Sequence, residues 1–263
     1  MVVNMTKKSR RKKFPLWQSI VLAICVPTFC ISTFLFFNDF FQYRAEDHAN
    51  IELSRKIREI RSDSKPAAEK VTDKFAEYEA LWALNHDFAG WLFIEDTKID
   101  YPVMHTPDDP EYYLHRAFDR SDASSGSLFA DAAYSMDGDS LLIYGHHMKD
   151  NSMFGSLTDY QSYEFAREHP VIHFDTLTEE RDYEVLAAFY WDPVPRQENA
   201  LFHYYEYPEL SSPEIFEEYI RQVKSYALYD TGVSTACGDK ILTLSTCSYH
   251  TNNGRFVVVA VSH

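Results

Sequence analysis

From residue 91 to the C-terminus the apolar residues fall into short runs, and this pattern limits the possible folds more than any other feature. The runs are rich in β-branched, aliphatic and aromatic residues and are separated by turn residues. Short strands at regular spacing predict a mostly β sandwich or barrel. The eight candidate strands are residues 91–95, 99–103, 127–130, 140–144, 171–174, 183–190, 240–246 and 255–261.

Two helical segments interrupt these strands. Residues 154–167 form a pattern typical of a broken helix, and residues 213–226 predict a longer one. Ser212 is the expected N-cap of the longer helix, with Pro213 at its first position. Its expected apolar face consists of Ile215, Tyr219, Ile220 and Val223.

One cysteine follows a strand-like run directly. Residues 241–246 are all aliphatic or β-branched apart from Ser245, and they end at Cys247. The next strand starts at Arg255, so the two strands predict a hairpin with Cys247 and Arg255 side by side. Cys247 is either a nucleophile at a strand end or a small apolar core residue, which is the commoner role of a free cysteine.

A nucleophilic thiol needs a basic or cationic neighbour. A cysteine with its ordinary pKa of ~8.5 is mostly protonated at neutral pH, so an imidazole must favour the thiolate. We predict that His146 has this role, because it follows the strand 140–144, expected across the barrel from the cysteine strand, and Gly145 permits a sharp turn. His147 and His250 are the competing histidines, and strand alternation lets only one of His146 and His147 face the cysteine.

Arg255 is the candidate for stabilising negative charge. Attack of a thiolate on a peptide carbonyl builds an oxyanion, which a fixed guanidinium can stabilise by ~3 kcal/mol or more in a water-poor site. A surface ion pair is the alternative role of Arg255. The remaining cysteines are Cys25 and Cys30 in an apolar span and Cys237, so no disulfide framework is expected.

These motifs resemble those of the sortases, the cysteine transpeptidases that attach surface proteins to the Gram-positive cell wall. Residues Thr243-Leu244-Ser245-Thr246-Cys247 are similar to the family's TLxTC signature, with His146 and Arg255 in the order the family requires. The resemblance covers about residue 81 to the C-terminus. Further segments that resemble the class B branch are residues 90–94, 99–103, 126–129, 152–155 and 229–233.

The resemblance implies a closed eight-stranded sortase-type β-barrel with added helices. It also implies that His146, Cys247 and Arg255 are catalytic and that Leu114 lies in the substrate groove. Ser245 and Thr246 directly precede the expected nucleophile and are further candidates for substrate binding. Pro110 stands where the class B segment usually has Asn, so the recognised peptide is expected to differ from the commonest class B motif.

The N-terminal part predicts a membrane anchor. Six basic residues precede residues 14–37, which contain no Asp, Glu, Lys, Arg or His and match the ~20 residues that a membrane helix needs. The basic flank places residues 1–13 in the cytoplasm and residue 38 onward outside. A cleaved signal peptide is the alternative, but the run is long and ends without a small-x-small site.

Residues 38–85 predict charged helical segments ahead of a catalytic domain at 86–263. Val71, Phe75, Tyr78 and Trp82 recur at helical spacing, so this part is either a solvated stalk or a helix pair packed on the domain. Beyond the basic tail the chain carries 19 basic and 40 acidic residues, which argues against nucleic acid as a partner.

The sequence thus predicts a single-pass membrane enzyme that cleaves the C-terminal sorting motif of secreted surface proteins through a Cys thioester. The expected acceptor is an amine of a cell-wall precursor or of peptidoglycan, and no cofactor or metal is expected. A pilin-polymerising sortase and a hydrolytic cysteine endopeptidase are the alternatives. A non-catalytic β domain that binds a surface ligand is the third.

Overall fold

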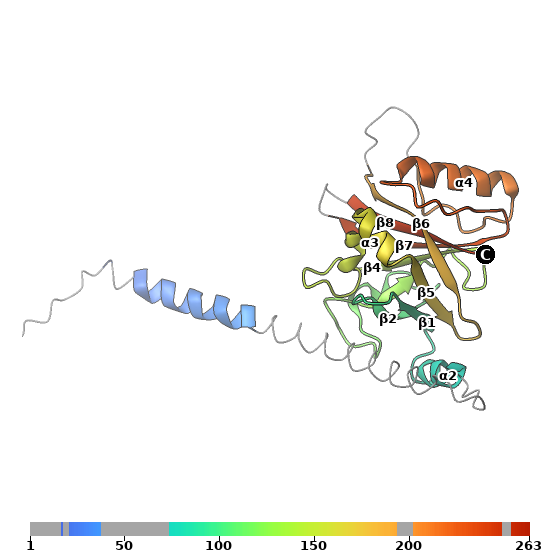
Figure 1. The fold of residues 1–263 in the computed structure, drawn as a ribbon. Helices are drawn as coiled ribbons and strands as arrows, with labels where there is room; N and C mark the ends of the chain where they lie inside the picture. Colours follow the sequence, from blue (N-terminus) through green and yellow to red (C-terminus); the bar gives the residue numbers. More distant parts are fainter. Residues whose placement is uncertain (1–16, 18–20, 38–73, 194–201, 249–253) are drawn as a thin grey trace, which may run out of the picture. The chain divides into compact units, whose positions relative to one another are not determined.

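The computed structural model describes residues 17, 21–37, 74–193, 202–248 and 254–263 (Figure 1). The chain divides into two compact units, Met1–Ala45 and Glu46–His263. In the first unit, residues 21–37 form a helix whose side chains are almost all exposed.

The structure describes only part of the predicted membrane span at 14–37, because residues 14–16 and 18–20 lie outside the described residues. None of the helices in the described part of the chain is both long enough and apolar enough to cross a membrane. The basic tail at 1–13 and residues 38–73, which include Val71, also lie outside the described residues.

Eight strands of the second unit close into one barrel in the order β1-β2-β3-β4-β7-β8-β6-β5. Closure leaves no open sheet edge, which an isolated sheet of this size would expose. The strands are β1 (Phe88–Phe93), β2 (Asp100–Met104), β3 (Leu128–Ala130), β4 (Ser140–Gly145), β5 (Val171–Thr176), β6 (Asp182–Trp191), β7 (Lys240–Ser248) and β8 (Gly254–Ser262). The eight predicted strands and the closed barrel are therefore confirmed, although β1 begins at Phe88 and not at residue 91.

The hairpin β7–β8 carries the most apolar part of the barrel. Its antiparallel register runs from Lys240↔Ser262 to Ser248↔Gly254. Residues 256–261 of β8 are all buried, as are residues 241–246 of β7. A strand buried on both faces loses the alternation of apolar and polar residues, which explains the unbroken apolar runs in the sequence.

The structure corrects one expected placement in the barrel. We predicted that the strand before His146 lies across the barrel from the cysteine strand, but β4 and β7 are hydrogen-bonded neighbours. They run parallel, with register from Ser140↔Ile241 to Gly145↔Thr246. A parallel pair needs a long crossover connection. Here that connection contains β5, β6 and the helical segments that precede β5 and follow β6.

The broken helix predicted at 154–167 is present as the 3-10 helix η2 (Ser156–Gln161) followed by α3 (Tyr163–Glu168). The long helix α4 (Pro213–Tyr226) has the predicted limits and packs against β6 (Figure 1). Two details of α4 differ from the prediction.

The Ser212 hydroxyl does not cap the backbone of α4 but donates to Glu214 Oε2 at 2.7 Å. The apolar face contains Phe216 in place of Ile215, which is 46% exposed. Phe216 matches the spacing of Tyr219, Ile220 and Val223 at i+3, i+4 and i+7, whereas Ile215 lies about 100° round the helix from it.

Residues 38–85 were predicted to be either a solvated stalk or helices packed on the catalytic domain. For its own residues, the helix α2 (Lys74–Leu84) is packed, because it lies against the barrel. Tyr78 and Leu81 are buried, and the Tyr78 hydroxyl donates to Asp175 Oδ2 of β5 at 2.7 Å. Trp82, expected on the buried face, is 39% exposed and packs against the ring of His86.

Candidate active site

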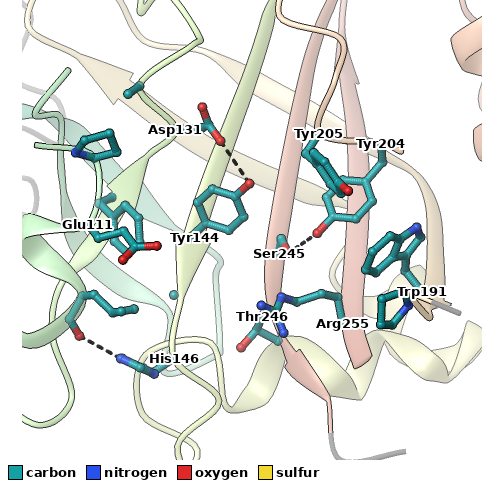
Figure 2. Close-up of a pocket in the computed structure, with 16 residues that line it drawn as sticks. Glu111, Asp131, Tyr144, His146, Trp191, Tyr204, Tyr205, Ser245, Thr246 and Arg255 are labelled. Carbon is teal, nitrogen blue, oxygen red and sulfur yellow. Dashed lines mark hydrogen bonds between the residues drawn. The ribbon is translucent and has the colours of Figure 1, made fainter. Parts of the chain in front are cut away.

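A cleft of about 580 Å³ opens at the end of the barrel where β4 and β7 finish. Five of the six predicted site residues line it. Figure 2 shows Tyr144 and His146 on one side of the cleft and Ser245, Thr246 and Arg255 on the other. The predicted residues in the lining are Leu114, His146, Ser245, Thr246 and Arg255.

The backbone register places the sixth residue, Cys247, at the same end. Gly145↔Thr246 is the last pair of the parallel ladder, so His146 and Cys247 are the residues that directly follow it on the two strands. In the antiparallel ladder Cys247 is opposite Arg255. The register thus brings the backbones of His146, Cys247 and Arg255 together at one end of the barrel; the Cys247 side chain lies outside the described residues.

His146 is held by the 3-10 helix η1 (Tyr112–His115). Its Nε2 lies 2.8 Å from the carbonyl oxygen of Leu114, and its ring stacks on that of His115 with centroids 5.5 Å apart and planes 23° apart. Burial lowers the pKa of His146 below the ordinary value; the Leu114 carbonyl opposes this and the charge of His115 adds to it. A lowered pKa favours the neutral imidazole, the form that can accept a proton.

Of the two competing histidines, the structure describes only His147, which does not line the cleft and forms an isolated bridge with Met153. His250 lies in residues 249–253, outside the described part of the chain. Gly145 permits the close packing before His146, because a Cβ there would lie closer than 3.0 Å to side-chain atoms of Leu128 and Phe154. Glycine is therefore needed here for close packing and not for the sharp turn that we predicted, because Gly145 is not among the described glycines with a positive φ.

Arg255 is partly buried at the start of β8. Its Nη1 donates to the carbonyl of Gly254 at 3.3 Å, and its backbone pairs with Trp191 of β6, which also lines the cleft. A cation fixed in this way can face an oxygen that becomes negative in the cleft.

Ser245 and Thr246 differ in their hydrogen bonding. Ser245 is buried, and its Oγ shares a hydrogen bond of 2.8 Å with the hydroxyl of Tyr204. Thr246 is 2% exposed, and its hydroxyl has no hydrogen-bond partner among the described residues. An unmatched buried hydroxyl costs about 1–3 kcal/mol, and a ligand atom in the cleft would remove this cost.

Several lining residues were not predicted. Tyr144 precedes His146 by two positions in the strand, and its hydroxyl donates to Asp131 Oδ2 at 3.1 Å. Burial raises the pKa of Tyr144, so its hydroxyl stays protonated. The period of two along a strand offered a signal for Tyr144. Tyr204 and Tyr205 come from an irregular segment, for which the sequence offered none.

In the part of the chain that the structure describes, no three His, Cys, Asp or Glu side chains are arranged to hold a metal ion.

A family model, related sequences and solved structures all identify the same family. The model of the sortase domain matches residues 92–263. Sortase B of Listeria monocytogenes is 34% identical over 186 residues, which cover 69% of this chain and 72% of that protein. Sortase B of Staphylococcus aureus is 28% identical over 188 residues, which cover 70% and 73%.

Two solved structures show the same fold. The S. aureus sortase B-substrate complex superposes with a TM-score of 0.71 at 26% identity and covers 84% of this chain and 97% of that chain. Sortase B from Bacillus anthracis in complex with AAEK1 gives a TM-score of 0.66 at 30% identity, covering 85% and 98%.

Proposed function

This chain belongs to the sortase family, and from that premise we propose that it is a class B-like sortase acting through Cys247. The proposed enzyme cleaves a sorting peptide near the C-terminus of secreted surface proteins and transfers the acyl part to an amine. The observation that carries the proposal is the register that places His146 and Cys247 directly after Gly145↔Thr246, with Arg255 opposite the cysteine.

The first half of the reaction forms a thioester. The Cys247 thiol loses its proton to His146, and the thiolate attacks the scissile carbonyl carbon. Arg255 stabilises the resulting oxyanion. The C–N bond then breaks, and the imidazolium of His146 gives its proton to the leaving amine.

The second half consumes the thioester. An acceptor amine attacks the same carbonyl carbon, His146 takes the proton of that amine, and Cys247 leaves as a thiolate that is reprotonated. Water in place of the amine would give hydrolysis. We propose an amine of a cell-wall precursor or of peptidoglycan as the acceptor, as the family suggests; a pilin lysine is the alternative acceptor.

The substrate is proposed to lie as an extended peptide in the cleft. Leu114 and Thr246 line it, and one of the similar structures is named as a sortase B complex with substrate. Another is named as a sortase B complex with triglycine, a short peptide that begins with an amine. Pro110 also lines the cleft, where it offers no amide side chain for recognising the peptide.

We also propose that the enzyme is anchored in the cell membrane, with a cytoplasmic N-terminus and an external barrel. The support is the sequence alone: six basic residues before residues 14–37, which contain no Asp, Glu, Lys, Arg or His.

The function is tested by incubating the full chain with NPxTx, SPxTG and LPxTG peptides, with and without candidate amines, and identifying products by mass. Transpeptidation predicts a ligated product whose amount increases with amine concentration. Cleaved acid alone at every amine concentration would favour the endopeptidase. No product with any peptide, together with no modification of Cys247, would contradict a catalytic function.

A further inference from the structure

We propose that η1 is a positioning element that fixes the tautomer of the catalytic histidine. The Leu114 carbonyl keeps a proton on His146 Nε2, so Nδ1 is the nitrogen that exchanges a proton with Cys247. That His146 exchanges a proton with Cys247 rests on the proposed function. Which nitrogen of His146 carries the proton does not.

The hydrogen bond between His146 and Leu114 has only one possible direction. A carbonyl oxygen carries no proton and can only accept, so at 2.8 Å the Nε2 of His146 is the donor. A neutral imidazole has one protonated nitrogen, and the other must be a free base. Nδ1 is therefore the nitrogen with a lone pair for a thiol proton. The backbone carbonyl here has the orienting function that a carboxylate has in a Ser-His-Asp triad.

The backbone of η1 is arranged so that this carbonyl alone is directed at the histidine. The carbonyls on either side of it bind the following loop: Tyr113 O accepts from the amide of Ser127, and His115 O accepts from the amide of Ala123, both at 3.0 Å. The Leu114 amide itself donates to Glu111 O at 3.0 Å. The orientation of the Leu114 carbonyl is therefore fixed by its neighbours.

Gly126 packs directly against the Leu114 carbonyl. Its φ is +57°, and a Cβ at this position would lie closer than 3.0 Å to the carbonyl oxygens of both Leu114 and Tyr113. Any side chain at position 126 would thus push the Leu114 carbonyl away from its present place. Glycine is also the residue that adopts this backbone conformation without strain.

A buried polar network anchors η1 to the barrel. The Tyr113 ring is fully buried, and its hydroxyl donates to Asp87 Oδ2 at 2.8 Å and accepts from Asn85 Nδ2 at 2.7 Å. Arg120 Nη2 donates to Asn85 Oδ1 at 2.9 Å and to Asp87 Oδ2 at 3.1 Å. A network whose groups are mutually satisfied at these distances holds its members rigidly, and Tyr113 is the residue before Leu114.

The direct test is nuclear magnetic resonance of the full chain labelled with 15N-histidine, with His146 identified by its absence in His146→Ala. The long-range 1H–15N pattern of the neutral ring, recorded above the pKa of His146, distinguishes the two tautomers. We expect the Nε2–H form. The Nδ1–H form, or an equal mixture, would overturn the proposal. Because no substrate is needed, this outcome is separate from any failure of transpeptidation.

A pair of glycine variants tests whether the support matters for catalysis. Gly126→Ala is compared with Gly232→Ala, which has a similar φ of +77° but nothing within 4 Å of the added Cβ. We expect kcat in Gly126→Ala to fall by about tenfold or more relative to Gly232→Ala, with KM changed little, and the tautomer preference of His146 to weaken. Equal kcat values in the two variants, or an unchanged tautomer, would contradict the positioning role.

Tyr113→Phe is the milder variant if Gly126→Ala does not fold. It keeps the buried ring and removes only the hydroxyl from the network. We expect a lower kcat at unchanged KM. A change confined to the melting temperature, with kcat and the His146 signals as in the wild type, would reduce the network to a stabilising role and contradict the proposal.

Discussion

His146 lies among groups with opposite effects on its pKa. Burial lowers the pKa, the Leu114 carbonyl raises it, and the charge of the stacked His115 lowers it. The net pKa lies below the ordinary value, so His146, the proposed base, is neutral at a pH where a surface histidine would be partly charged. Of these three effects on the pKa of His146, only the charge of His115 can be removed by a substitution that keeps a stacked ring.

We predict that His115→Phe raises the pKa of His146. Phenylalanine keeps a flat ring but removes the like charge, so protonation of His146 becomes easier. The acidic limb of kcat/KM against pH reports the pKa of the base in the free enzyme, so it should move to higher pH. His86→Phe, just after α2 and outside the cleft lining, is the control and should leave the limb in place. A shift to lower pH in His115→Phe would be inconsistent with this reasoning.

Arg255→Lys should lower kcat by about tenfold or more and change KM little. Lysine keeps the charge but loses the planar fork that fixes the donors, and removing an oxyanion donor typically costs about 10²–10³ in kcat. Steady-state rates with one fixed peptide measure both constants. An increase in KM alone would instead make Arg255 a peptide-binding residue and leave the oxyanion to backbone donors.

The sequence predicted several of the side chains that meet at the cleft, whereas their catalytic roles stay a prediction. His146, Cys247 and Arg255 each end or begin a strand-like run, and the family motif selects them among the other His, Cys and Arg residues. The Leu114 carbonyl was not predictable, because a backbone oxygen has no residue type. Leu114 was expected in the groove for its side chain, whereas its carbonyl makes the contact with His146.

At the scale of elements, a buried pair of hydroxyls joins α4 to β7, the strand of the proposed nucleophile. The Tyr219 hydroxyl lies 2.9 Å from Thr243 Oγ1 on β7, and both residues are buried. Next to it along β7, Ser245 makes the same kind of contact with Tyr204 at 2.8 Å. Thr243 and Ser245 are thus matched by tyrosines from the segment before β7, whereas the buried hydroxyl of Thr246 has no partner among the described residues.

We predict that Tyr219→Phe lowers the free energy of unfolding by about 1–3 kcal/mol, because the Thr243 hydroxyl is left buried without a partner. Replacing both groups, in Tyr219→Phe with Thr243→Val, should cost less than the sum of the two single changes. Urea denaturation of the full chain measures each value. Additive losses would mean that the two hydroxyls do not stabilise each other.

Local signals located the eight strands and α4, although β1 begins at Phe88 and not at residue 91, but they did not indicate which strands are neighbours. The limits of α4 follow from Pro213 and the spacing of its apolar residues. The parallel pairing of β4 with β7 was missed, because the two strands are separated by a long crossover and no local pattern encodes which strands become neighbours. The closed barrel itself was expected from the family resemblance and not from strand counting.

At the scale of the whole molecule, the charge is divided between a basic N-terminal segment and an acidic remainder. An acidic body does not favour binding to polyanions, whereas a basic segment beside an apolar span favours the cytoplasmic face of a membrane. The two parts therefore suit different environments.

We predict that protease added to intact Gram-positive cells expressing the chain removes the barrel and leaves a protected N-terminal fragment. The reason is the expected orientation, with residues 1–13 inside and residue 38 onward outside. Fragments are identified by antibodies to each end, and permeabilised cells are the control in which both ends are digested. A barrel that stays intact on intact cells would contradict the proposed topology.

The covalent intermediate gives the most direct test of catalysis through Cys247. Intact-protein mass spectrometry after mixing the enzyme with a cleavable sorting peptide, without amine, should show one added acyl group. Fragmentation should locate it at Cys247. Cys237→Ala should form the same adduct, and Cys247→Ala should form none. An adduct that persists in Cys247→Ala, or product formation by that variant, would contradict the proposed mechanism.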